Sequence, residues 1–192
     1  ALGLEQFTPA NARGSSHGGS RIFRHAYFEH AEYVPLLRHS TARFESLEVE
    51  SGVPLLNRCG MLVMGTQGSE TVRGSLESAA RWGLDVEHLD DAAILRRFPW
   101  FDVPPGTIGA FETNAGVVRP EAAVDAALRV AAARGAELRT GTCVRDLIED
   151  ATGVTVRTAG GDERASAVVI AAGPWAARLI PELAPLLRVT RQ

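Results

Sequence analysis

The chain has 192 residues, which is enough for one domain or two small ones with a proper hydrophobic core. Its formal net charge of −3 gives no electrostatic reason to expect nucleic acid or an anionic membrane as a partner. No apolar run approaches the roughly 20 residues that a membrane span requires. We therefore expect a cytoplasmic protein with a site for a small molecule.

The residue types that are absent or rare narrow the chemistry. All 20 basic residues are arginine, so no lysine of this chain can form a Schiff base or act as a general base. The two cysteines, Cys59 and Cys143, are too few and too far apart for a disulfide framework or a zinc site. We expect both to be small buried apolar residues and expect no metal site. Because the chain starts at Ala1 without a methionine, we interpret it as a piece of something longer.

The first half of the chain predicts a strand, a long helix and then short mixed elements. Residues 1–7 indicate a buried strand, and residues 29–51 have the apolar spacing of an amphipathic helix that ends at Gly52. Shorter helices and strands are predicted after it, with candidate helix N-caps at Ser69 and Asp90. Strands are predicted over 59–65, 85–89 and 107–112, and helices over 69–82 and 90–98.

The second half begins with a helix over 121–134, with Pro120 at its first position and Gly135 after its end. Strands are predicted over 137–140, 144–150, 153–158 and 166–171, with a turn at Gly160-Gly161. The last of these strands is apolar throughout, as a fully buried parallel strand would be. A short helix follows Trp175.

Two stretches carry the chemistry, and each has a purely structural alternative. Residues 14–27, GSSHGGSRIFRHAY, combine glycines and hydroxyls with Arg21 and Arg24, whose guanidinium groups can hold a carboxylate or phosphate bidentately. The alternative is a mobile surface loop with solvated arginines. Residues 168–175, VVIAAGPW, place small residues between a strand and a helix start, where a chain can pass beneath a planar cofactor or a phosphate. The alternative there is a plain turn between strand and helix.

With both stretches in view, the chain resembles the flavin-dependent amine oxidases that include monomeric sarcosine oxidase and N-methyltryptophan oxidase, within the D-amino-acid-oxidase-like group. The resemblance runs nearly from end to end, in the right order and spacing. Its segments are LGLEQF, GSSHGGSRIFRHAYFEHAEYVPLL, CGMLVMG, RRFPWFDVPPG, AGVVRPEAAVDAALRVAAARGAELRTGTCV and VVIAAGPWAARL.

The resemblance implies FAD as cofactor and assigns residues to its adenosine end and to the segment beneath it. Glu5 matches the acid that binds the ribose of the adenosine, and Val144 matches the residue whose backbone meets the adenine. Ala172, Gly173 and Trp175 match the segment that passes under the cofactor.

The resemblance also assigns the loop beside the flavin ring and the substrate. His17, Ser20 and Arg21 match the loop along the ring, with Arg21 close to the isoalloxazine. Arg24 matches the arginine that pairs with the substrate carboxylate, and Tyr27 lies on the same wall. An arginine near the flavin stabilises negative charge on the ring, and a second arginine orients the amino acid.

Family members also carry an early GxGxxG turn, a cysteine that attaches the flavin and a lysine that activates dioxygen, and none of these is found in the chain. We expect an α/β protein with an incomplete Rossmann-like FAD-binding domain over 1–54 and 120–190 and an inserted α+β substrate domain over 55–119.

The expected activity is oxidation of the C–N bond of a sarcosine-like α-amino acid to an imine, with dioxygen as acceptor and hydrogen peroxide as product. The alternatives are an FAD-dependent dehydrogenase or a D-amino-acid or glycine oxidase of the same fold, and an inactive fragment without cofactor.

Overall fold

The computed structural model describes residues 1–189, which form two compact units. Unit 1 comprises residues 1–18 and the described part of 124–192, and unit 2 comprises residues 19–123. The FAD-binding domain predicted from the sequence has different boundaries, 1–54 and 120–190, because it groups the residues that are expected to bind the cofactor. That assignment stays a prediction, and its last residue lies outside the described part.

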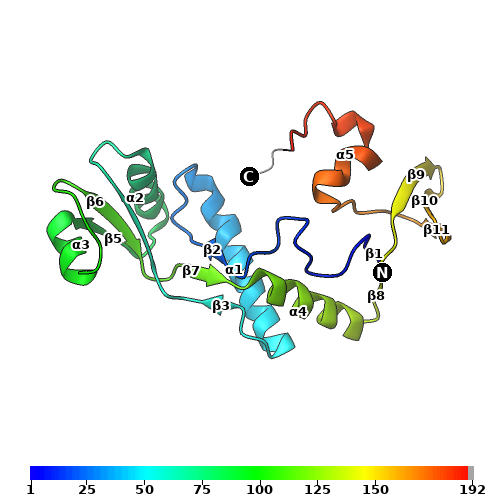
Figure 1. Ribbon diagram of the computed structural model, residues 1–192, viewed down its shortest axis with the longest axis horizontal. Coiled ribbons are helices and arrows are strands. Elements are labelled where there is room, and N and C mark those ends of the chain that lie inside the picture. Colours follow the sequence, from blue (N-terminus) through cyan, green and yellow to red (C-terminus); the bar gives the residue numbers. More distant parts are fainter. Residues whose placement is uncertain (190–192) are drawn as a thin grey trace. The chain divides into compact units, whose positions relative to one another are not determined.

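Unit 2 contains two three-stranded sheets and several helices (Figure 1). One sheet has the order β4-β6-β5 and the other the order β2-β7-β3, and all of their pairs are antiparallel. The strands are β2 (Arg21–Phe23), β3 (Leu56–Asn57), β4 (Met61–Gly65), β5 (Val86–Asp90), β6 (Ile108–Glu112) and β7 (Gly116–Val118). The helices are η1 (Ala31–Tyr33), α1 (Val34–Ser51), α2 (Glu70–Trp82) and α3 (Asp91–Arg97).

The helices of unit 2 begin and end where local signals place them. Ser69 accepts a hydrogen bond from the backbone N–H of Val72 at the start of α2, and Asp90 accepts one from Ala93 at the start of α3. Gly52 ends α1 in the left-handed conformation, with φ of 68°, which glycine adopts without strain. These predictions from the sequence are confirmed.

The core of unit 2 lies between the β4-β6-β5 sheet and its helices. Both α2 and α3 contact this sheet. The buried cluster beside α3 consists of Leu89, Ile94, Val103 and Phe111, with Leu62, Ala93 and Phe98 packed against it. Strand β6 is therefore largely buried, up to and including its last residue, Glu112.

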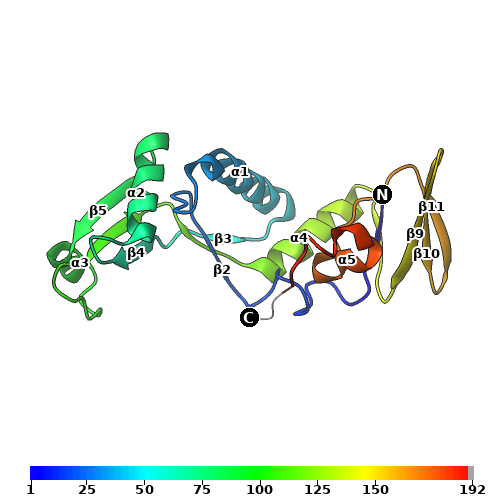
Figure 2. The same ribbon diagram turned by 90° about the horizontal axis from the view of Figure 1, so that it is seen from above.

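Unit 1 contains a parallel pair, β1-β8, and an antiparallel sheet, β11-β10-β9, which is seen in Figure 2. Its strands are β1 (Leu2–Leu4), β8 (Glu137–Arg139), β9 (Val144–Asp150), β10 (Gly153–Thr158) and β11 (Gly161–Ala165). Its short helices are η2 (Gly173–Trp175), α5 (Ala176–Leu179) and η3 (Pro181–Leu183). Helix α4 (Pro120–Ala133) begins in unit 2 and continues into unit 1, with Pro120 as its first residue.

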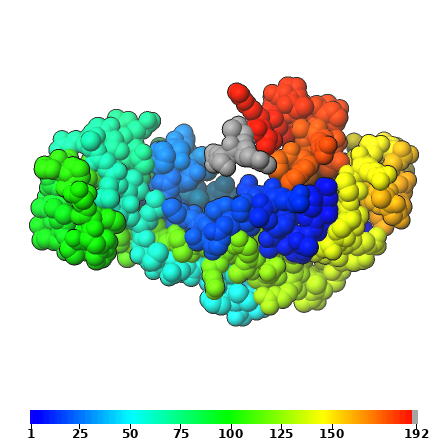
Figure 3. Space-filling view, in the orientation of Figure 1, coloured from blue at the N-terminus to red at the C-terminus, as the bar shows by residue number. Residues whose placement is uncertain are grey.

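The predicted strand over 166–171 is wrong. The strand that follows the turn at Gly160-Gly161 is β11, which the sequence analysis missed, and residues 166–172 have no strand assignment. An apolar run becomes a strand only where a neighbour supplies ladder hydrogen bonds, and among the described residues none pairs with this run. Val169 consequently exposes 92% of its surface. The run 166–172 belongs to the orange part of the chain in Figure 3.

The expectation that both cysteines are buried is also wrong. Cys59 and Cys143 are exposed, because each lies in a connecting segment just before a strand instead of on the apolar face of one. Within residues 1–189 no helix is long and apolar enough to cross a membrane.

Candidate functional site

Unit 1 brings three of the predicted cofactor segments together. Glu5 follows β1, and its backbone N–H donates to the carbonyl of Arg139 at 3.0 Å. The N–H of Thr142, two residues before Val144, donates to the carbonyl of Glu5 at 2.9 Å. The ring of Trp175 packs against that of Phe7, with 5.6 Å between their centroids. Glu5, Val144 and Trp175 thus lie on neighbouring segments of one unit.

The carboxylate of Glu5 is only partly used by the protein. Its Oε1 accepts a hydrogen bond from the N–H of Phe7 at 2.8 Å, and Oε2 has no partner among the described residues. Gly173 has φ of +51°, and no atom of residues 1–189 lies within 4 Å of the position that a Cβ would occupy. An acid with a spare oxygen and a turn with open space beside its backbone are features that fit a ribose and a planar ligand.

The remaining predicted residues follow one another in the early loop. His17 is in unit 1, whereas Ser20, Arg21, Arg24 and Tyr27 are in unit 2. The convergence of the arginines and the turn at 172–175 on one cofactor stays a prediction.

Residues 18–21 lead from the loop into a strand. Gly18 and Gly19 have φ of 105° and 74°, and the N–H of Gly19 donates to the carboxylate of Glu121 at 3.1 Å. Arg21 opens β2, where it pairs with Val118 of β7, and its Nη1 donates to the carbonyl of Ser20 at 3.2 Å. The extended backbone of 21–23 separates Arg21 from Arg24, so the two do not form one anion clamp by their spacing alone.

Arg24 is the more buried of the two arginines and is held by three neighbours in sequence. Its guanidinium lies 4.8 Å from the ring centroids of both Tyr27 and Phe28. Its Nη2 is 3.3 Å from Oε2 of Glu29, and only 14% of the Arg24 side chain is exposed, against 43% for Glu29. A cation in this setting can exchange its exposed carboxylate partner for a carboxylate from solution.

Arg24 and Tyr27 also line a cavity of about 630 Å³ in unit 2. Most of its lining is apolar and comes from β2, α1, β4 and the segment after β2. The other lining residues are Ile22, Phe23, Phe28, Leu37, Ser40, Thr41, Phe44, Met61, Leu62, Val63, Thr71 and Val118. A mainly apolar cavity with one buried arginine is suited to a small ligand that carries a carboxylate.

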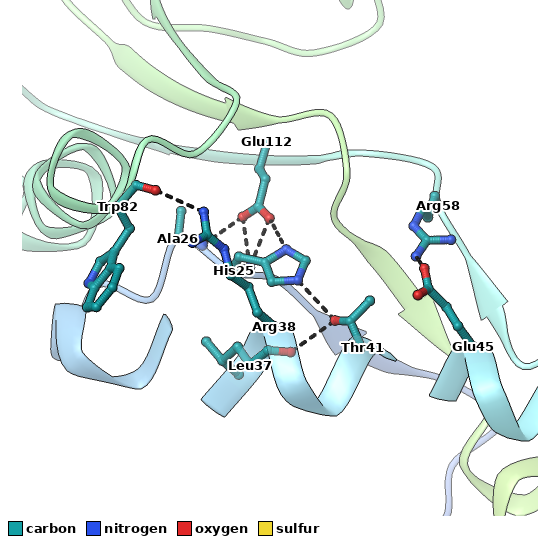
Figure 4. Close-up of polar contacts among 9 residues, drawn as sticks. All are labelled: His25, Ala26, Leu37, Arg38, Thr41, Glu45, Arg58, Trp82 and Glu112. Atoms are coloured by element: carbon teal, nitrogen blue, oxygen red, sulfur yellow. Dashed lines mark hydrogen bonds and ion pairs between the residues drawn. The ribbon is translucent and has the colours of Figure 1, made fainter. Parts of the chain in front are cut away.

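Sequence reasoning missed a polar network around Glu112, which is drawn in Figure 4. Glu112, at the end of β6, is 5% exposed. Its carboxylate accepts hydrogen bonds from the backbone N–H groups of His25 and Ala26, each at 2.9 Å, and lies 2.9 Å from Nδ1 of the His25 ring. His25 Nε2 is 2.9 Å from Oγ1 of Thr41 on α1. We call Glu112, His25 and Thr41 the Glu112 network.

The electrostatics of Glu112 follow from these bonds. Burial raises the pKa of its carboxyl, but the hydrogen bonds from the His25 side chain and from the N–H groups of Ala26 and His25 outweigh burial. The pKa of Glu112 therefore lies below its ordinary value, and the group is ionised at neutral pH. In the sequence, the one sign of this network was an acid at the end of an apolar strand. The backbone N–H groups that bind this acid lie 86 and 87 positions earlier in the chain.

Comparison with known proteins identifies the class. The model of the family described as "FAD dependent oxidoreductase" matches residues 2–192. The chain belongs to this family, as the sequence predicted, and its mixed helix and strand fold is that of the FAD-dependent oxidases. Among residues 1–189, no group of His, Cys, Asp or Glu side chains is arranged to hold a metal ion.

Two curated relatives show which oxidases the chain is similar to in sequence. Monomeric sarcosine oxidase of Streptomyces avermitilis is 41% identical over 191 residues, which are 100% of this chain and 50% of that protein. N-methyl-L-tryptophan oxidase of Citrobacter koseri is 39% identical over 175 residues, which are 91% of this chain and 47% of the relative. The chain thus spans about half the length of the curated relatives that it matches.

Solved structures of two oxidases are also similar to the structure of this chain. NikD, described as an unusual amino acid oxidase essential for nikkomycin biosynthesis, matches with a TM-score of 0.84 and 28% identity, over 95% of this chain and 47% of NikD. Glycine oxidase from Geobacillus kaustophilus matches with a TM-score of 0.80 and 26% identity, over 95% of this chain and 51% of that structure.

Proposed function

We propose that the protein is an FAD-dependent oxidoreductase that oxidises the C–N bond of an N-methyl or related α-amino acid to an imine, which water then hydrolyses. The observation that carries the proposal is Arg24, a nearly buried guanidinium beside two aromatic rings at the wall of a cavity. Its exchangeable partner, Glu29, makes it a site for the carboxylate that every α-amino acid carries.

The residues of unit 1 fit the cofactor of the family. Glu5, with its spare oxygen, would hold the ribose, and Val144 would meet the adenine with its backbone. Ala172, Gly173 and Trp175 would lie along the cofactor, where the turn leaves open space. The chemistry that FAD supplies when bound is the acceptance of a hydride from the substrate, with the electrons passing on to dioxygen.

The loop residues would serve the ring and the substrate. His17 and Ser20 would line the ring, and Arg21 would add a permanent positive charge beside it, which favours electron transfer to the cofactor. Arg24 would hold the substrate carboxylate and Tyr27 would bound the same wall, so that the reacting C–H is oriented. Dioxygen as acceptor, hydrogen peroxide as product and the cytoplasmic location complete the proposal.

The experiment that tests this function uses the whole protein that contains the chain. It should purify yellow, oxidise sarcosine or another N-methyl amino acid, and release one hydrogen peroxide per imine formed. Oxidation with an artificial acceptor but without peroxide would instead support a dehydrogenase. A colourless preparation that gains no flavin absorbance on addition of FAD would refute the cofactor assignment.

The substitution Arg24→Leu tests the carboxylate site. Loss of a hydrogen bond to a charged group costs about 1.5–3 kcal/mol, so KM should rise about 10- to 100-fold. Arg38→Leu is the matched control, because Arg38 donates to the backbone carbonyl of Trp82 at 2.8 Å and has no role in the proposed site. An unchanged KM in Arg24→Leu would overturn the amino-acid assignment.

A further inference from the structure

Glu112 is a buried charge that the proposed function does not use. Burial of an ionised carboxylate is costly unless hydrogen bonds compensate it, and Glu112 collects three donors to do so. Two of these donors are consecutive backbone N–H groups, those of His25 and Ala26. They belong to the two residues that follow Arg24, so the carboxylate fixes the backbone that carries the arginine.

The acceptors in the Glu112 network determine which of its atoms carry protons. Thr41 has one hydroxyl proton and two neighbours, the carbonyl of Leu37 at 3.0 Å and Nε2 of His25 at 2.9 Å. Whichever neighbour receives that proton, Nδ1 of His25 faces an ionised carboxylate, which can only accept. Nδ1 therefore carries a proton toward Glu112, and the ring of His25 lies between Glu112 of β6 and Thr41 of α1.

The segment is immobilised on its other side as well. Ser78 of α2 donates from Oγ to the carbonyl of Tyr27 at 2.6 Å. A void of about 10 Å³ beside Arg24, Ala26 and Glu112 is at the lower limit for one water molecule, so water has little access to the carboxylate. Residues 25–27 have no helix or strand assignment, and these side chains supply the hydrogen bonds that a ladder would otherwise give.

We propose that Glu112, acting with His25, is a positioning residue that holds Arg24 in the orientation in which it binds the substrate carboxylate. This inference rests on the proposed function of Arg24. Glu112 touches neither substrate nor cofactor in this role. Its contribution is to fix the backbone next to Arg24 before the ligand arrives, so that binding does not have to order it.

The test is the substitution Glu112→Gln in the whole protein. Glutamine keeps the shape but has one acceptor oxygen, so its amide N–H₂ must face one of the donors of His25 or Ala26. Binding of propionate, a carboxylate without an oxidisable amine, is measured by calorimetry, and KM and kcat are measured with the amino-acid substrate. We expect propionate affinity to fall about tenfold, with KM rising more than kcat falls.

Glu48→Gln is the matched control for stability. Glu48 also accepts from two consecutive backbone N–H groups, those of Leu55 at 2.6 Å and Leu56 at 2.8 Å, but on a segment that does not carry Arg24. It should lower the free energy of unfolding and leave propionate affinity unchanged. If Glu112→Gln behaves like Glu48→Gln, the positioning role is refuted and Glu112 is only structural.

A double substitution separates this inference from the function on which it rests. If Glu112 acts through Arg24, adding Glu112→Gln to Arg24→Leu causes no further loss of propionate affinity. Additive losses would overturn the positioning role while leaving the carboxylate site intact. If Arg24→Leu itself binds propionate like the unchanged protein, the proposed function fails first, and the inference fails with it.

Discussion

The substitution Gly74→Ala examines how closely helix α2 approaches the segment that carries Arg24. A Cβ at position 74 would lie 2.4 Å from the carbonyl oxygen of Phe28 and 3.1 Å from its carbonyl carbon and Cα. Alanine in a helix interior is favoured over glycine by about 1 kcal/mol, so propensity alone predicts a more stable protein. The close approach to Phe28 instead predicts a less stable protein, and the sizes of the two effects decide which one prevails.

Overpacking costs about 1–3 kcal/mol, and more where the neighbour cannot move. Here the neighbour is backbone, and the adjacent carbonyl of Tyr27 is bound to Ser78 of the same helix. Separating the helix from the segment would break that bond, at a further cost of about 1 kcal/mol. Against the helix gain, the net loss in the free energy of unfolding is about 1–3 kcal/mol.

Urea unfolding followed by circular dichroism measures this loss. Gly68→Ala is the matched control, because no atom of the described part of the chain lies within 4 Å of its Cβ position and its backbone is not left-handed. It should change stability by less than about 0.5 kcal/mol. A Gly74→Ala protein that is as stable as the unchanged one would refute the contact between α2 and Phe28.

Two further predictions concern charge. Glu29→Gln removes the carboxylate that competes for Arg24, and since exposed ion pairs contribute about 0.2–1 kcal/mol, propionate should bind up to about fivefold more tightly; weaker binding in calorimetry would contradict the exchange of partners. The folded-state pKa of Glu112 lies below its ordinary value of 4.5, so its contribution to stability is present above pH 4.5 and is lost as pH falls through the folded pKa. Urea unfolding between pH 6 and 3 should therefore show a steeper acid loss in the unchanged protein than in Glu112→Gln, and parallel curves would contradict the lowered pKa.

The sequence by itself determined the elements whose signals are local. The cap at Ser69, the glycine after α1 and the proline at the start of α4 act within a few residues of the chain, so their helices could be predicted without any distant contact. The order of motifs also determined the family, because cofactor segments keep their residue types and spacing along the chain.

Tertiary structure decided what depends on pairing across the chain. The strands β2, β3 and β7 have only two or three residues each, and they exist because residues 21–23, 56–57 and 116–118 meet in one sheet. The apolar run 166–171 shows the converse, since β propensity without a ladder partner left it outside any strand. Glu112 was visible in the sequence only as the end of a strand, and its role arises because folding buries its charge against backbone donors 86 and 87 positions away.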